Sequence, residues 1–342
     1  MKITTVGIEL AKSVFQIHGN DNHGQAVLRK KLNRDKMLAF FTQLPPCLIG
    51  MEACGSAHYW ARKLVTMGHT VKLMAPQFVK PYVKTNKNDA ADAAAICEAV
   101  TRPNMRFVPI KTHEQQAVLS LHRVRQGCVK SRTAQANQIR GLLSEFGVVI
   151  PQGISNIAKR LPEIMETSDL PGTFRELLQR LYDFLKTLDK QVDEMDGKIL
   201  QLHRASETSR RLAEIPGIGP ITATALIASI GDARNFKNGR QLAAWLGLVP
   251  RQHSSGGKSV LLGTSKRGDV YLRTLLIHGA RAVIRLVDNT PSTHWLNKLL
   301  ARRNKNVAAV ALANKNARIV WALLTHEEQR FRADYVTAIA SP

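Results

Sequence analysis

Apolar and polar positions in the N-terminal third of the chain follow the short period of strands, interrupted by helical periods. Apolar runs predict strands at residues 3–10, 13–18, 26–32, 47–51 and 71–74. Helices are predicted between the later strands, at residues 34–44 and 56–67, and Ser56 is placed to cap the second helix. Three meandering strands followed by helix, strand, helix and strand are typical of a ribonuclease-H-like α/β fold.

A long basic helix is predicted at residues 114–146. Its apolar stripe consists of Val118, Leu121, Val124 and Cys128. Its other positions carry Arg123, Arg125, Lys130, Arg132 and Arg140, and no acid occurs between Gln115 and Ser144. A charged helix face usually meets only solvent. Because this long face carries one sign of charge, we favour contact with nucleic-acid phosphates.

Residues 178–202 repeat apolar side chains every three or four positions, as a coiled coil does. The seam consists of Leu178, Leu181, Leu185, Leu188, Val192, Met195, Ile199 and Leu202. Charged residues such as Asp189 and Asp196 flank it, so we favour a contact between subunits. Packing within one chain is the alternative.

The remainder of the chain is predicted to be mostly helical. Ile215–Gly219 precedes an apolar helix and resembles the turn of a helix-hairpin-helix motif. Such a turn offers backbone N–H groups to a phosphate. A tight turn without a ligand is the alternative. Residues 253–258 predict a Ser/Gly-rich loop, and helices are predicted at residues 270–287 and 306–324. We divide the chain into domains at residues 1–150, 151–208 and 209–342.

Charge indicates the class of partner. The 342 residues include 49 Lys and Arg against 26 Asp and Glu, a formal net charge of +23. Such an excess suits a polyanion and favours nucleic acid. A ribosome-associated or merely basic protein is the alternative. No amphipathic basic N-terminus supports a role at a membrane surface.

Cysteine usage and hydropathy predict a cytoplasmic protein. The scattered cysteines, Cys47, Cys54, Cys97 and Cys128, form no CxxC pair, which argues against a zinc module and a disulfide framework. No signal peptide pattern opens the chain, and no apolar run approaches the roughly 20 residues that span a bilayer. We therefore expect no membrane partner.

Acids at the ends of predicted buried strands suggest a metal site. Glu9 ends one apolar run and Glu52 directly follows another, and a carboxylate there is costly unless it is paired or binds a metal. Asp89 and Asp92 are three residues apart, so a helix places both on one face. Acids in a first helical turn also favour the helix dipole, which alone explains that pair. All four acids together favour a site for two Mg²⁺ ions about 4 Å apart, an arrangement that enzymes use to cleave phosphodiesters.

A serine in a glycine-rich stretch is the second chemical candidate. Ser254 and Ser255 precede Gly256 and Gly257. The basic residues around them are Arg251, Lys258, Lys266 and Arg267. A serine there could attack phosphorus and form a phosphoserine link, although most such stretches are flexible loops.

These motifs together resemble the DEDD transposases of insertion sequences. That family is related to the Piv-type DNA invertases, and the resemblance implies a RuvC-like nuclease domain in the N-terminal part. The N-terminal part of the resemblance consists of Val6–Lys12, Met51–Gly55 and Lys87–Asp92. The C-terminal part consists of Ile215–Gly219, Ala244–Pro250, Ser255–Lys258 and Ser265–Asp269. The match spans nearly the whole chain, in the order that the family has.

The resemblance implies a mechanism. Glu9, Glu52, Asp89 and Asp92 would bind Mg²⁺, and Ser255, which directly precedes glycine, would join covalently to a DNA strand end. A structured bridge RNA would guide the protein to donor and target DNA. A homo-oligomer, a dimer assembling to a tetramer, would bring the acids of one subunit to the serine of another. The protein would be cytoplasmic and would associate with the nucleoid when it acts.

One position departs from the family pattern, which has Asp where this chain has Glu9. The extra methylene advances the carboxylate by about 1.5 Å, and Mg²⁺ tolerates little distortion of its shell. A hydrolytic, RuvC-like resolvase that leaves Ser255 idle is the alternative function. A non-catalytic RNA-binding protein is a third, which the four acids disfavour.

Overall fold

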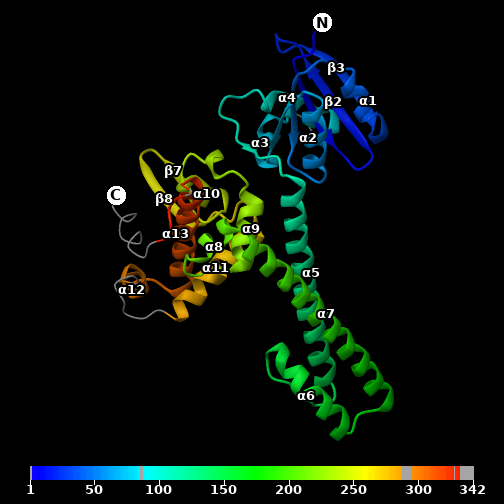
Figure 1. Ribbon diagram of the computed structural model, residues 1–342, viewed down its shortest axis with the longest axis vertical. Helices are drawn as coiled ribbons and strands as arrows, with labels where there is room; N and C mark the ends of the chain where they lie inside the picture. Colours follow the sequence, from blue (N-terminus) through cyan, green and yellow to red (C-terminus); the bar gives the residue numbers. More distant parts are fainter. Residues whose placement is uncertain (1, 85–87, 287–293, 327, 332–342) are drawn as a thin grey trace. The chain divides into compact units, whose positions relative to one another are not determined.

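The computed structural model describes residues 2–84, 88–286, 294–326 and 328–331. It divides into an N-terminal unit, Met1–Thr112, and a C-terminal unit, His113–Pro342 (Figure 1). The division lies before the basic helix and not at the predicted residue 150, because that helix shares its apolar side with later helices. Lys87 of the third N-terminal motif and Val287 at the end of a predicted helix lie outside the described residues.

The N-terminal unit is built on a mixed sheet with the strand order β3-β2-β1-β4-β5-β6. The strands are β1 (Thr5–Leu10), β2 (Val14–Asn20), β3 (Ala26–Asn33), β4 (Leu48–Glu52), β5 (Thr70–Met74) and β6 (Phe107–Val108). β1, β2 and β3 are antiparallel, whereas β4 and β5 continue the sheet parallel to β1. Except for β6, these strands were predicted, and the mixed α/β class of the unit is confirmed.

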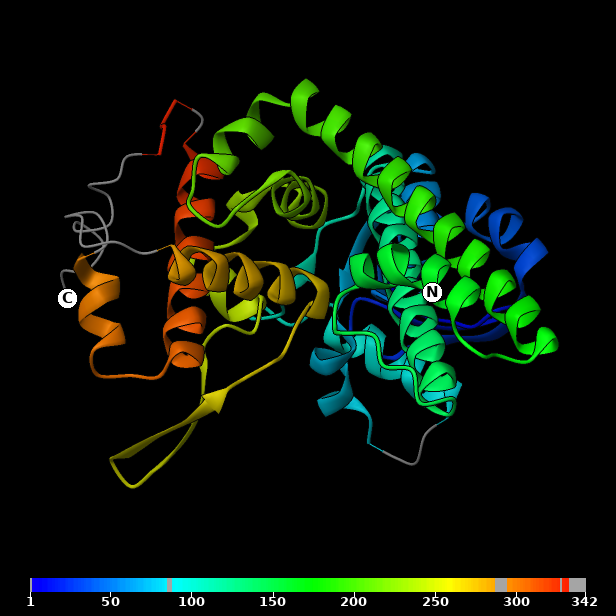
Figure 2. The same ribbon diagram turned by 90° about the horizontal axis from the view of Figure 1, so that it is seen from below.

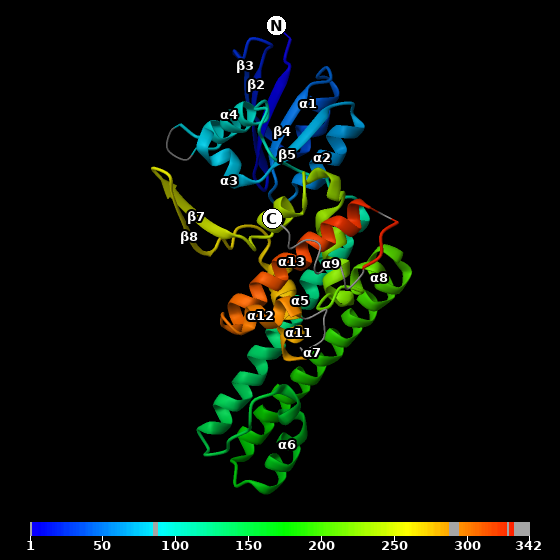
Figure 3. The ribbon, with the colours of Figure 1, turned by 90° about the vertical axis from the view of Figure 1, so that its left-hand side faces the viewer.

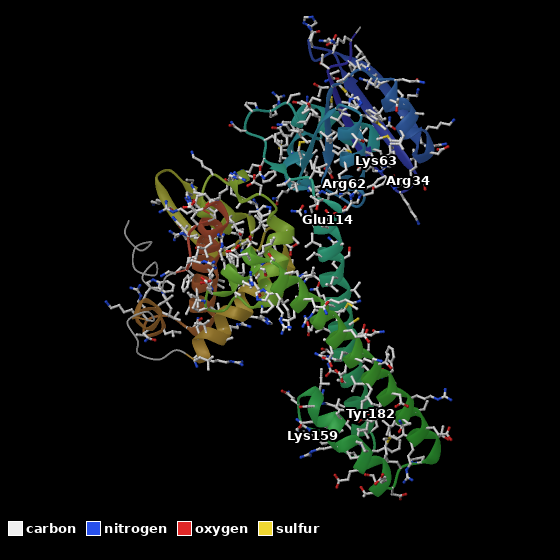
Figure 4. The ribbon with its side chains drawn as sticks, in the orientation of Figure 1. Arg34, Arg62, Lys63, Glu114, Lys159 and Tyr182 are labelled. Carbon is white, nitrogen blue, oxygen red and sulfur yellow. The ribbon has the colours of Figure 1, made fainter. Side chains whose placement is uncertain are left out.

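Helices cover both faces of this sheet (Figure 3). α1 (Met37–Thr42), which continues the short helix Arg34–Lys36, and α2 (Ala57–Thr66) cover one face, whereas α3 (Pro76–Val79) and α4 (Asp89–Ala99) lie on the other. The predicted cap of α2 is wrong: Ser56 has a φ of 66° and its side chain makes no capping hydrogen bond. Farther along this helix, the Arg62 guanidinium donates a hydrogen bond to the Lys111 carbonyl, at 2.6 Å (Figure 4).

α4 approaches the sheet so closely that two strand positions must be glycine. A Cβ on Gly7 would lie 2.2 Å from the Ala93 carbonyl oxygen, and one on Gly50 would lie 2.8 Å from Val100 Cβ. The Cys97 thiol donates to the Thr5 carbonyl, at 3.7 Å. α4 therefore runs antiparallel to β1 and begins near the carboxyl end of that strand.

A long helical hairpin opens the C-terminal unit. It pairs α5 (His113–Ser144) with α7 (Gly172–Ala205), which lie side by side, and α6 (Ile154–Thr167) packs at its far end (Figure 1). The Tyr182 hydroxyl on α7 donates to the Ala158 carbonyl on α6, beside Lys159 (Figure 4).

The heptad seam of α7 packs within its own chain, which corrects the favoured interpretation of a contact between subunits. Its positions Leu178, Leu185, Leu188, Val192 and Ile199 are buried in the single chain. The flanking charges that suggested a subunit contact serve the same hairpin, because Asp196 pairs with Arg125 and Asp189 with Arg132 of α5. The last seam position, Leu202, is exposed.

The rest of the C-terminal unit surrounds a second core. Its helices are α8 (Glu207–Ala213), α9 (Pro220–Ile230), α10 (Gly239–Trp245), α11 (Val270–Arg285), α12 (His294–Leu300) and α13 (Lys305–Thr325), with the short helix Ala233–Asn235 before α10. The turn between α8 and α9 has Gly217 at a φ of 87°, packed against Gly279 of α11. The prediction of a mostly helical C-terminal part is confirmed.

One helix corrects the expectation about membrane-length segments. α13 is long and apolar enough, by length and composition, to cross a bilayer. Just over half of its apolar stretch, including Ala309, Ala313, Ala317 and Val320, is buried in the core of the C-terminal unit. This burial accounts for the composition of α13 without a membrane.

Candidate active site

The first candidate site, in the N-terminal unit, lies at the carboxyl ends of two neighbouring parallel strands. β1 and β4 pair with Ile8 opposite Met51, so the next residues, Glu9 and Glu52, lie side by side. Alternation along each strand places Glu9 on the face of Gly7 and Glu52 on the face of Gly50. Both glycines meet α4. The two glutamates therefore share the face of the sheet that α4 covers.

The aspartates lie on the first turn of α4, at the same edge of the sheet. The Asn88 side chain caps this helix by accepting from the Ala90 N–H, at 2.9 Å. Asp89 is exposed and Asp92 is half-buried. Because α4 runs antiparallel to β1, its first turn faces the strand end that carries Glu9.

A neighbouring thiol reports the charge at this edge. The pKa of Cys54 is raised by burial and then by the negative charges of Glu9 and Glu52. A cation placed here would relieve the repulsion between the two carboxylates, and hard carboxylate oxygens are the donors that Mg²⁺ prefers. In chemical type these donors fit a divalent ion.

The backbone brings the four acids to one edge of the sheet, but their side chains do not form a metal-binding cluster. Among the residues that the structure describes, no three His, Cys, Asp or Glu side chains lie close enough together to hold a metal ion. The fold therefore brings Glu9 and Glu52 together and brings the α4 pair to their edge, but the aspartate side chains do not close around a common point with them.

The second candidate site is a two-stranded hairpin in the C-terminal unit. It pairs β7 (Pro250–Ser255) with β8 (Lys258–Thr264), so the predicted loop at residues 253–258 is wrong. Gly256 and Gly257, with φ of 55° and 77°, form the two-residue turn. Nearly all of the hairpin's residues are exposed, and it projects away from the helices of its unit (Figure 2).

The pairing separates the two serines onto opposite faces of this hairpin. Ser255 pairs with Lys258 and His253 pairs with Val260, so these four side chains share one face. Ser254 lies on the other face, where its hydroxyl accepts from the Gln252 amide, at 2.9 Å. Only Ser255 therefore combines a hydroxyl with a neighbouring ammonium and imidazole.

The base of the hairpin is held by close backbone contacts. A Cβ on Gly247 would lie 1.9 Å from the Arg267 carbonyl oxygen, and one on Gly268 would lie 1.9 Å from the Trp245 carbonyl oxygen. The buried Arg273 guanidinium donates to the carbonyls of Leu246 and Arg267, at 3.2 and 3.1 Å. The stretches Ala244–Pro250 and Ser265–Asp269 thus form one rigid platform below an exposed tip.

The predicted nucleic-acid contacts separate into two groups. Arg125 and Arg132 form ion pairs with α7, and Arg140 donates to the Gly153 carbonyl, at 2.7 Å, so these three stabilise the helical hairpin. The remaining predicted contacts are exposed: Arg123, Lys130, Arg251, Lys258, Lys266 and Arg267.

Sequence reasoning missed two features near these sites. Cys54 was treated only as an unpaired thiol, although its position two residues after Glu52 places it at the same strand end. His253 was not considered because residues 253–258 were treated as a loop. Applying strand alternation around Gly256–Gly257, a two-glycine turn typical of hairpins, could have found it.

Two parts of the sequence match models of transposase families. Residues 6–148 match a DEDD transposase family named for IS110, and residues 209–295 match the Transposase IS116/IS110/IS902 family. The chain belongs to this IS110-type family and is a DNA transposase.

Relatives span the chain almost from end to end. It is 56% identical to a probable family 20 transposase of Pseudomonas aeruginosa over 96% of this chain and 98% of the relative. It is 46% identical to the transposase for insertion sequence element IS1111A of Coxiella burnetii, over 95% and 91%. A pilin gene-inverting protein of Moraxella bovis is 26% identical over 60% and 57%.

Proposed function

We propose that this transposase joins DNA strands through a phosphoserine intermediate on Ser255 and uses Glu9, Glu52, Asp89 and Asp92 to bind Mg²⁺, two ions per site. The observation that carries the proposal is the hairpin register, which puts Ser255 on one face with His253 and Lys258. The adjacency of Glu9 and Glu52 at one strand end supports the metal-binding half.

In the joining step, Ser255 Oγ forms a bond to phosphorus and the bond from phosphorus to the leaving deoxyribose oxygen breaks. The serine proton passes to His253 or to water, and the leaving oxygen takes up a proton. Lys258 offsets charge on the phosphate oxygens. When bound, Mg²⁺ supplies Lewis-acid stabilisation of the phosphate and of the leaving oxygen. A second strand end then attacks phosphorus and releases the serine, so the number of phosphodiester bonds is conserved.

The proposal includes a bridge RNA that pairs with donor and target DNA, and a dimer that assembles to a tetramer. The family resemblance and the net charge of +23 support these partners. The exposed Arg123 and Lys130 on α5, and the turn between α8 and α9, are the surfaces that we assign to nucleic acid. Sequencing the RNA that copurifies with the protein tests guidance: one enriched structured RNA is expected, and a bulk cellular mixture would contradict it.

The serine is tested on denaturing gels of a cleavage reaction containing Mg²⁺. Wild-type protein should form a protein–DNA adduct, Ser255→Ala should form none, and the control Ser254→Ala should retain it. Asp89→Asn should remove cleavage and adduct together. Cleavage that persists without an adduct in Ser255→Ala would instead support a hydrolytic resolvase.

A further inference from the structure

A pocket of about 690 Å³ lies at the base of the serine hairpin, within the C-terminal unit. Residues from both ends of the hairpin, from α12 and from α13 line it, and these segments are seen together in Figure 3. Its volume lies within the range for small-molecule sites. Neither the acids nor Ser255 line it, so it is separate from the site described above.

The pocket combines an apolar wall with two cations. Trp295, Leu262 and Val310 supply apolar surface. The Lys315 ammonium lies 4.6 Å from the centre of the Trp295 ring, and its pKa is lowered by burial and then by Arg318. The pKa of Arg318 is lowered by burial and then by Arg240. Crowded, partly desolvated cations favour an anion in this pocket.

Amide groups line the same space. The Asn304 side chain caps α13 by accepting from the Val307 N–H, and Asn314 donates to the Leu248 carbonyl. An amide offers two donors and an acceptor oxygen, so each of these side chains can make further hydrogen bonds. Asparagine amides match the edges of nucleobases.

The hairpin connects this pocket to the serine. Strand pairing places Lys258 on the face of Ser255, whereas Thr264 pairs with Pro250 beyond a shift in register and so lies on the face of Ser254. Leu262 and Thr264 also line the pocket. From Pro250 to Ser255 the strand rises about 17 Å, which equals about five stacked steps of a DNA strand. A nucleic-acid strand that is held at Ser255 and follows the hairpin to its base is therefore long enough to reach the pocket.

We infer that the pocket binds one unstacked nucleotide of a nucleic-acid strand, with its base against the apolar wall and its phosphate against Lys315 and Arg318. The inference rests on the proposed function in one respect, since the strand that it positions is the one that Ser255 would join. Binding itself needs no covalent step, so the two ideas can fail separately.

The test measures equilibrium binding by Ser255→Ala protein of labelled single-stranded eight-nucleotide DNA and of RNA of the same sequence. Each base in turn is replaced by an abasic unit. We expect one position to weaken binding about tenfold, whereas other positions change it little. Comparing the DNA and RNA arms shows which strand occupies the pocket.

Ala311→Phe fills the pocket without removing a charge. In this variant, loss of the base at the sensitive nucleotide should no longer weaken binding. Ala282→Phe adds the same ring at an exposed position of α11 and should bind as the parent does. If Ala311→Phe does not fold, Val307→Trp at the exposed rim serves the same purpose. Arg318→Gln should lower the salt dependence of binding by about one phosphate contact, and the exposed Arg285→Gln is its charge-matched control.

Equal effects of base loss in Ala311→Phe and in its parent would overturn the inference. So would unchanged binding of both strands by Ala311→Phe with altered sedimentation, because that result would assign the pocket to a second copy of the chain. If wild-type protein forms no adduct in the cleavage reaction while the Ser255→Ala protein shows the abasic signature, the covalent mechanism is rejected and the pocket is kept.

Discussion

The two candidate catalytic elements differ in how the chain supports them. Glu9 and Glu52 end strands in the middle of a sheet, and α4 packs against that sheet at atomic contact through Gly7 and Gly50. Ser255 lies at the tip of a hairpin whose residues are nearly all exposed. An isolated two-stranded hairpin is marginally stable in water. The acid edge is therefore fixed by its own unit, whereas the serine tip depends on what binds it.

This difference assigns separate tasks to the two elements. A rigid edge suits Mg²⁺, which demands a near-ideal octahedral shell. An exposed tip on a rigid platform suits a nucleophile that must reach a large polymer, and here the platform is held by Arg273 and by Gly247 and Gly268. Substitutions of the glycines that pack the acid edge against α4 should therefore act on folding, whereas substitutions at the tip should act on chemistry without a change in global stability.

The largest expected effect is that of Gly7→Ala. The added Cβ would lie 2.2 Å from the Ala93 carbonyl oxygen and 2.4 Å from the Cys97 nitrogen, both backbone atoms of α4. We expect a loss of about 3 kcal/mol or more, measured by urea unfolding. Gly127→Ala, in α5 with nothing near its Cβ, is the control and should be neutral or stabilising. Equal stability of the two variants would show that α4 packs less tightly than described.

The next largest effect is expected at His122 of α5, which contacts α9 and α11. His122 is buried, and its ring contacts the Tyr271 and Thr224 hydroxyls, at 3.0 and 3.1 Å. Burial, and then Arg125, lower the pKa of His122 to about 4, against the opposing charge of Asp196.

Because the folded pKa of His122 is depressed, the stability that it contributes is present above pH 6.5. That stability is lost as the pH falls towards 4, in total about 3 kcal/mol. Unfolding followed by tryptophan fluorescence, to which Trp245, Trp295 and Trp321 of the C-terminal unit contribute, should show this slope in wild-type protein and a flatter one in His122→Gln. The same slope in both proteins would contradict the assignment.

A smaller effect is expected at Glu9 and Glu52, and it tests their proposed role in binding Mg²⁺. Glu9→Asp shortens the side chain by about 1.5 Å towards the family residue, so we expect the rate of Mg²⁺-dependent DNA cleavage to be kept or raised. Glu52→Asp, which withdraws the neighbouring carboxylate, should lower that rate. A fall in cleavage by Glu9→Asp with intact folding would count against the metal-binding role of this position.

The smallest effect on folding is expected at the tip. Gly257→Ala places a side chain at a φ of 77° with nothing within 4 Å, at a local cost of about 1–2 kcal/mol. The midpoint of global unfolding should stay unchanged, because the tip packs on no core, whereas adduct formation should fall severalfold. A drop in the midpoint would mean that the hairpin is part of the cooperative fold.

Sequence patterns located the strands β1 to β5, the long helix α5 and the acids at strand ends, since period and burial are local properties of a segment. They failed where two arrangements satisfy one pattern. A heptad seam is the same whether its partner is α5 or a second subunit. Arg125 and Arg132 likewise look like phosphate contacts until Asp196 and Asp189 of α7 are found beside them.

By itself, the sequence determined the α/β and helical classes of the two parts, the positive charge and the residue types available for metal and phosphate chemistry. Only the tertiary structure decided that Glu9 adjoins Glu52, that Ser255 and Ser254 face opposite ways, and that Lys315 lies against Trp295. Propensity and periodicity act over a few residues, whereas adjacency across strands and helices depends on pairing register and packing between segments far apart in the chain.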